Sequence, residues 1–140
     1  MKKGLILLLI SLILIPVLSF GQSKIDGLLS KLNKLHKENR VLGYGKIEDI
    51  FLNKTDKTID IDNKIIPLTN YTANYEEIYN LKLERNVNVV KISCLDKENC
   101  MIDSKTQDDY KSLGFYFKTK KACYDFINLI EEIKQVELDF

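Results

Sequence analysis

The stretch from Ser112 to Val136 constrains the fold most, because its hydrophobic period changes there from two to about 3.6. Leu113, Phe115 and Phe117 alternate with Gly or more polar residues, which predicts a strand with one apolar face. After Thr119, whose hydroxyl can cap a helix, apolar residues recur at steps of three and four: Cys123, Phe126, Ile127, Ile130 and Ile133. This spacing predicts an amphipathic helix. A helix this short is only marginally stable alone in water, so its apolar face needs a surface to pack on, and the strands upstream are the candidate.

The first 21 residues have the pattern of a secretory signal peptide. Lys2 and Lys3 give a positive start, a nearly unbroken apolar run follows, and small residues precede a predicted cut before Gln22. The sequence therefore predicts a signal peptide over 1–21 and a single domain over 22–140, secreted or periplasmic. The alternative is an uncleaved segment that anchors the protein in the membrane.

The predicted mature chain has 119 residues, enough for one domain with a sizeable core. It carries 19 basic residues against 20 acidic ones, a formal charge of −1. Such a balance gives no general attraction to nucleic acid or to an anionic membrane surface, so neither is an expected partner of the mature protein. Export makes disulfides possible.

An amphipathic helix is predicted over 22–40, ahead of the strands. Its apolar stripe, opposite several lysines, is formed by Ile25, Leu28, Leu29, Leu32 and Leu35. We expect this helix to pack on the domain; the alternative is a detachable helix that binds a partner or a membrane surface. Gly43 and Gly45 then predict a turn.

An antiparallel β meander is predicted over 44–118, followed by a capping helix over 119–136. Short apolar runs separated by polar turns predict six or seven strands, near 47–52, 59–61, 65–68, 78–84, 89–95, 101–102 and 113–117. Asp62-Asn63 is a turn signal, Arg85 to Asn88 a second hairpin turn, and Pro67 places the third strand at an edge or at its own end. The fold class is α+β, mainly β, with the sheet bent into a barrel whose opening the last helix covers.

This order of elements resembles a pleckstrin-homology-like (PH-like) domain, here within a small exported bacterial protein. The resemblance rests on the strands from Ile47 to Phe117 and on the junction SLGFYFKTKKACYDFINLI. It implies a bent seven-strand barrel with a C-terminal helix at one end. It also implies that Phe126 takes the place of the tryptophan that the family commonly carries in its final helix.

Three cysteines are present. A three-residue turn at Asp96 to Glu98 would place Cys94 and Cys100 opposite each other in a hairpin, where the short Cα separation of a disulfide is possible. We therefore predict a bridge between Cys94 and Cys100. Cys123 lies on the apolar face of the last helix and is expected to be a small buried side chain.

No catalytic constellation or metal site is predicted. His36 is the only histidine; it lies beside the stripe of the first helix and is expected to be solvated or partly packed. Asp60 and Asp62 are expected to lie on the solvent-exposed face of a strand, because the ligands that would complete a calcium-binding loop do not follow them. We therefore expect no enzyme activity and no cofactor.

The predicted function is that of a non-enzymatic binding module. A sheet edge or the grooves beside the helices could take up a protein or peptide. Tyr71, Tyr75 and Tyr79, placed in a loop and at the start of a strand, are the best candidates for an exposed binding surface; the alternative for each is packing in the core or in a turn. The alternative is a carrier of small apolar ligands that uses an open barrel interior, which would require a cavity of several hundred Å³, on the order of those that hold such ligands.

Overall fold

A computed structural model describes residues 2–41 and 46–139 of the chain, and their side chains from residue 21 onward. It contains two helices and eight strands among these residues. In chain order these are α1 (Lys2–Asn39), β1 (Phe51–Asn53), β2 (Thr58–Ile61), β3 (Lys64–Pro67), β4 (Tyr71–Asn80), β5 (Arg85–Cys94), β6 (Met101–Asp103), β7 (Asp109–Tyr110), β8 (Ser112–Phe117) and α2 (Lys120–Asp139). The predicted turn at Gly43 and Gly45 lies outside the described residues.

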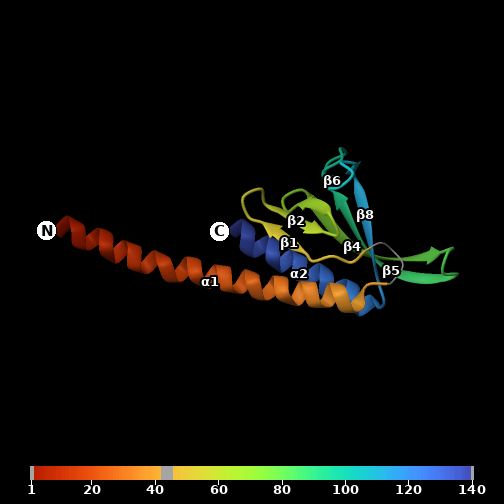
Figure 1. The fold of residues 1–140 in the computed structure, drawn as a ribbon, viewed down its shortest axis with the longest axis horizontal. Helices are drawn as coiled ribbons and strands as arrows, with labels where there is room; N and C mark the ends of the chain where they lie inside the picture. Colours follow the sequence, from red (N-terminus) through yellow and green to blue (C-terminus); the bar gives the residue numbers. More distant parts are fainter. Residues whose placement is uncertain (1, 42–45, 140) are drawn as a thin grey trace.

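The described strands form two antiparallel sheets, with orders β1-β2-β3-β6-β7 and β4-β5-β8 (Figure 1). The expectation of one closed barrel is therefore wrong, although the antiparallel, mainly β architecture is confirmed. The reason lies at the outer edge of β8. The end of that edge, at Tyr116 and Phe117, is covered by the chain that leaves α1, through a bridge between Arg40 and Phe117 and a 3.0 Å hydrogen bond from the Val41 N–H to the Tyr116 carbonyl. β8 therefore makes no ladder with the five-stranded sheet.

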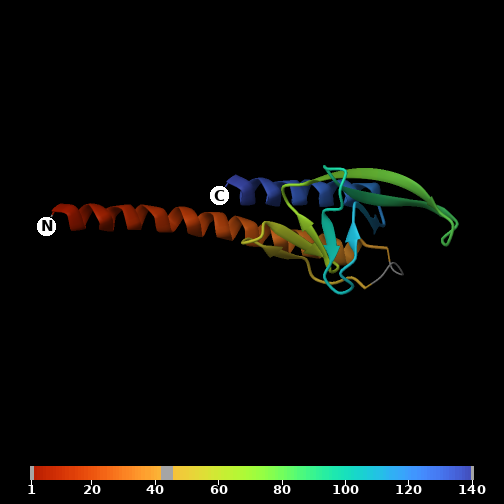
Figure 2. The ribbon, with the colours of Figure 1, turned by 90° about the horizontal axis from the view of Figure 1, so that it is seen from above.

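The two helices run antiparallel and side by side, and α2 packs on the three-stranded sheet (Figures 1 and 2). The predicted cap of α2 is confirmed, because the Thr119 hydroxyl oxygen accepts a 3.1 Å hydrogen bond from the Ala122 N–H. The apolar stripe of α2 points inward as expected. Its fully buried members are Cys123, Phe126, Ile130 and Ile133.

α1 also packs on the domain, with Ile25, Leu28 and Leu32 buried in the same apolar core as the stripe of α2. Its helical backbone continues from Lys2 without a break, so the first half extends away from the sheets (Figure 2). Cleavage before Gln22 and export stay predictions. Among the described residues, no helix combines the length and the apolar character needed to span a bilayer.

The longest hairpin is formed by β4 and β5, and it differs from the sequence prediction. The prediction placed a loop before Ile78 and a turn at residues 85–88, whereas the strands run over 71–80 and 85–94 with the turn at 81–84. Asn80 decides the turn locally, because its side-chain oxygen accepts a 2.9 Å hydrogen bond from the Leu83 N–H. Glu84 then takes a positive φ of 51° before the chain returns.

Two smaller predictions about turns hold. Pro67 is the last residue of β3 and lies beyond the residues that pair with β6, so its missing N–H interrupts no ladder there. Asp62 and Asn63 form the β2–β3 turn with φ values of 52° and 66°, a conformation that Asp and Asn tolerate better than most residues.

Candidate functional site

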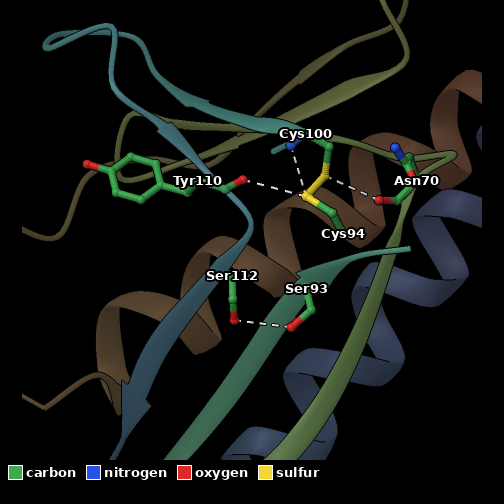
Figure 3. The surroundings of a disulfide bond; sticks show 6 residues. All are labelled: Asn70, Ser93, Cys94, Cys100, Tyr110 and Ser112. Atoms are coloured by element: carbon green, nitrogen blue, oxygen red, sulfur yellow. Dashed lines mark hydrogen bonds between the residues drawn. A yellow bond between two sulfur atoms is a disulfide. The ribbon is translucent and has the colours of Figure 1, made fainter. Parts of the chain in front are cut away.

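The predicted disulfide between Cys94 and Cys100 is present, with a Cα separation of 5.8 Å (Figure 3). Its setting differs from the prediction, because the two cysteines do not face each other within one hairpin. Cys94 ends β5 in the three-stranded sheet, and Cys100 precedes β6 in the five-stranded sheet. The bridge therefore ties the two sheets together at the point where the chain crosses between them.

Removing this bridge is expected to lower the free energy of unfolding by about 2 kcal/mol, the chain-entropy value for so short a loop. The measurement is urea unfolding of the double variant Cys94→Ser/Cys100→Ser against the wild type. The control is the wild type in reductant, which should unfold at the same urea concentration as the variant. Alkylation of the unfolded, unreduced protein should label Cys123 alone, and labelling of all three thiols would contradict the bridge.

β4 forms one edge of the three-stranded sheet, and the direction of its backbone groups follows from two hydrogen bonds. The Leu95 N–H donates to the Asn70 carbonyl at 3.3 Å, and the Cys94 N–H donates to the Lys111 carbonyl at 2.9 Å. Backbone groups alternate in direction along a strand, so even-numbered residues of β4 bond to β5. The odd-numbered ones face outward along a ten-residue edge: Ala73, Tyr75, Glu77 and Tyr79.

The three tyrosines nominated from the sequence all lie on β4, but they do not form one exposed surface. Tyr71 is buried, so of its two predicted roles the structure has core packing and not exposure; the Nζ atom of Lys134 on α2 lies 4.7 Å from its ring centroid. Burial raises the pKa of its hydroxyl far above the ordinary value. Tyr75 packs against Tyr124 of α2 with ring centroids 5.3 Å apart. Only Tyr79 is strongly exposed, at 60%.

The end of the β4–β5 hairpin extends past both helices in both views of the ribbon (Figures 1 and 2). Ile78, Tyr79 and Leu81 place apolar surface there, and Leu81 is 85% exposed. An exposed apolar group at the end of a long unpaired strand edge is a feature that soluble proteins usually avoid unless it has a partner.

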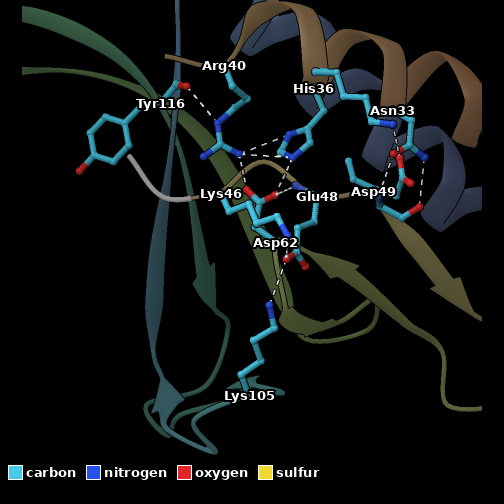
Figure 4. Close-up of polar contacts among 11 residues, drawn as sticks. Asn33, His36, Arg40, Lys46, Glu48, Asp49, Asp62, Lys105 and Tyr116 are labelled. Carbon is cyan, nitrogen blue, oxygen red and sulfur yellow. Dashed lines mark hydrogen bonds and ion pairs between the residues drawn. The ribbon is translucent and has the colours of Figure 1, made fainter. Parts of the chain in front are cut away.

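A buried polar cluster joins α1 to the β2–β3 turn (Figure 4). His36 and Arg40, one turn apart on α1, both reach Asp62: His36 Nε2 lies 2.9 Å from Asp62 Oδ1, and Arg40 Nη1 lies 2.6 Å from Asp62 Oδ2. The Glu48 N–H donates a further 2.9 Å hydrogen bond to Asp62 Oδ1. Arg40 also donates from Nε to the Tyr116 carbonyl at 3.1 Å. The cluster thus fixes α1, both sheets and the segment around Glu48 to one another.

The electrostatics of this cluster favour an ionised Asp62. Burial alone would raise the pKa of this carboxyl group, but the hydrogen bonds from His36 and the Glu48 amide, with the charge of Arg40, lower it to about 2. His36 is satisfied when Nε2 carries the proton and donates to Asp62, while Nδ1 faces Arg40 Nη1 at 3.3 Å. The ring of Phe126 stacks beside the imidazole, with centroids 6.0 Å apart.

This cluster is the feature that reasoning from the sequence missed. The expectation of a solvated or partly packed His36 is wrong, because its side chain is fully buried. The expectation that Asp62 lies on the solvent-exposed face of a strand is also wrong, because its side chain is only 14% exposed and its carboxylate pairs with His36 and Arg40 of α1. One signal was available: His36 lies four residues after Leu32 and Arg40 four residues after His36, on the continuation of the apolar stripe.

Comparison of the chain with protein-family models, with curated proteins and with solved structures gives no match. Within the described parts of the chain, no three His, Cys, Asp or Glu side chains are grouped so that they could hold a metal ion. Two features of the described surface are prominent: the free edge of β4 with its apolar tip, and the polar surface around the buried cluster.

Proposed function

We propose that this protein is an exported, non-enzymatic binding module that takes up an extended peptide or protein segment along the free edge of β4. The observation that carries the proposal is the length of this edge. β4 has ten residues, whereas the strands of the other sheet have two to four. An added strand would pair with the outward backbone groups of β4, and the apolar tip would give it side-chain contacts.

Two further observations support a binding module. The rings of Phe115, Phe117 and Phe126 pack together in the buried core, with the Phe117 centroid 4.8 Å and the Phe115 centroid 6.3 Å from that of Phe126, so side chains rather than a ligand fill this part of the protein. His36 is enclosed in the cluster with Asp62 and Arg40, so it has no access to a substrate. The resemblance to PH-like domains stays a prediction.

The test uses peptides selected from a random displayed library on the oxidised protein. We expect binding to slow hydrogen exchange at the outward amides of β4, those of Ala73, Tyr75, Glu77 and Tyr79. Glu77→Pro removes one outward N–H without touching the ladder to β5, and should weaken binding about tenfold, the value of one or two backbone hydrogen bonds of about 1 kcal/mol each.

Glu77→Ala is the matched control, since it removes the same carboxylate but keeps the N–H. It should bind like the wild type or nearly so. Equal binding by Glu77→Pro and wild type, or exchange protection on the helices instead of β4, would refute the edge as the docking site.

A further inference from the structure

A polar pocket of about 360 Å³ lies at the opposite edge of the three-stranded sheet, along β8. Its base is formed by residues 113–115 of β8. Its walls come from Lys46 and Glu48, from the β2–β3 turn, and from the loop that begins at Asp103. Figure 4 shows Lys46, Glu48, Asp62 and Lys105 among these lining residues. The two sheets meet there without pairing, and the proposed peptide edge on β4 plays no part in it.

The base of this pocket holds two hydrogen-bond donors that the described protein leaves unused. The Tyr116 carbonyl accepts hydrogen bonds from Val41 and Arg40, so the backbone groups of Tyr116 point away from β5. Backbone groups alternate in direction along a strand, so the N–H of Gly114, two residues earlier, points the same way, into the pocket. Arg40 engages Nε and Nη1 with Tyr116 and Asp62. Its Nη2 has no partner among the described residues, and Arg40 lines the pocket.

The charged side chains that line the pocket leave one positive charge in excess. Two of its cations are matched one to one, Arg40 by Asp62 and Lys64 by Asp103. Glu48 is shared by two lysines, with its Oε1 3.0 Å from Lys105 Nζ and 3.6 Å from Lys46 Nζ. Both lysine side chains are exposed, at 61% and 84%, so the unbalanced charge lies at the mouth of the pocket.

We infer that this pocket binds a carboxylate group. A carboxylate oxygen would accept from Arg40 Nη2 and the Gly114 N–H at the base, and its single negative charge would balance the excess at Lys46 and Lys105. A planar acceptor with two oxygens suits a guanidinium beside a backbone amide. The group can come from a small organic acid or from the C-terminus of a peptide, since both present the same chemistry.

The experiment is an NMR titration of the full mature chain, labelled with ¹⁵N, with sodium acetate and with acetamide as its neutral analogue. We expect saturable shifts with acetate at the amides of Gly114, Glu48 and Lys105, and none with acetamide. A second titration uses one short peptide with a free and with an amidated C-terminus. Saturation by acetate identifies a small acid as sufficient, whereas saturation by the free peptide alone identifies a chain terminus. No saturable shift with acetate or with either peptide overturns the inference.

Charge reversal separates the pocket from a general salt effect. Lys105→Glu turns the excess charge from positive to negative at an exposed position and should weaken carboxylate binding about tenfold. The control is Lys121→Glu on α2, an equally drastic change of an exposed lysine that does not line this pocket. Equal affinities of Lys105→Glu and wild type would overturn the inference, and so would an equal loss in Lys121→Glu. Glu77→Pro, which tests the peptide edge, should leave acetate binding unchanged.

Discussion

Replacing Asp62 with asparagine is expected to lower the free energy of unfolding by about 3 kcal/mol, because it leaves the buried guanidinium of Arg40 without its counter-ion. Asparagine has the size of aspartate and tolerates the positive φ of this turn. The lost stability is therefore due to the missing charge and not to strain in the backbone. Its amide group would also present a donor where Arg40 already donates. The measurement is urea unfolding followed by circular dichroism.

Asp49→Asn is the matched control. Asp49 also pairs with a side chain of α1, Lys37, but both partners are half exposed, and such pairs contribute about 0–1 kcal/mol. Similar losses in both variants would show that the buried cluster does not anchor α1.

The difference in free energy of unfolding between wild type and Asp62→Asn should also depend on pH. The pKa of Asp62 lies at about 2 in the folded protein, below its ordinary value of 3.8. A carboxyl group whose pKa is lower in the folded than in the unfolded protein stabilises the fold at any pH above its ordinary pKa, and this stabilisation is lost as the pH falls toward 2. The gap between the two proteins should therefore be full above pH 4 and shrink as the pH falls to 2. A constant gap over this range would mean that Asp62 does not act as a carboxylate.

Phe126→Ala is expected to cost about 4 kcal/mol, the largest effect of a single substitution that we predict. Phe126 is fully buried, and its ring contacts the rings of Phe117, Phe115 and His36. Its removal would leave a cavity where α2 meets the three-stranded sheet and α1, and the packed neighbours cannot all move to fill it. Unfolding in urea measures the loss.

Tyr124→Ala serves as the control on the same helix. Tyr124 is about half exposed and contacts Tyr75 near the surface, so its loss should cost less than about 1 kcal/mol. If both variants lost the same free energy, α2 would not be seated on the core through Phe126.

Local patterns in the sequence were reliable wherever hydrophobic period and local chemistry decide the structure. The apolar stripe of α2, its Thr119 cap and the Asp62-Asn63 turn all hold, because each depends on residues within a few positions of one another. The β4–β5 hairpin was displaced for a related reason. Leu81 and Leu83 continue an apolar alternation, but the Asn80 side chain bonds to the Leu83 N–H and turns the chain there.

The candidate site was predicted only in part. The sequence predicted the pairing of Cys94 with Cys100, but it did not indicate that the bridge joins two sheets. Of the three nominated tyrosines, only Tyr79 is strongly exposed. It also gave no sign that Asp62 would meet His36 and Arg40, from which it is separated by more than twenty residues.

What the sequence alone determined is therefore the nature of both helices and of most strands, which face of each helix is apolar, and where several turns lie. The tertiary structure alone decided that the strands divide into two sheets, that β4 keeps a free edge, and that a pocket opens beside β8. The physical reason is that hydrophobic period acts over neighbouring residues, whereas sheet pairing and buried ion pairs depend on contacts between distant segments.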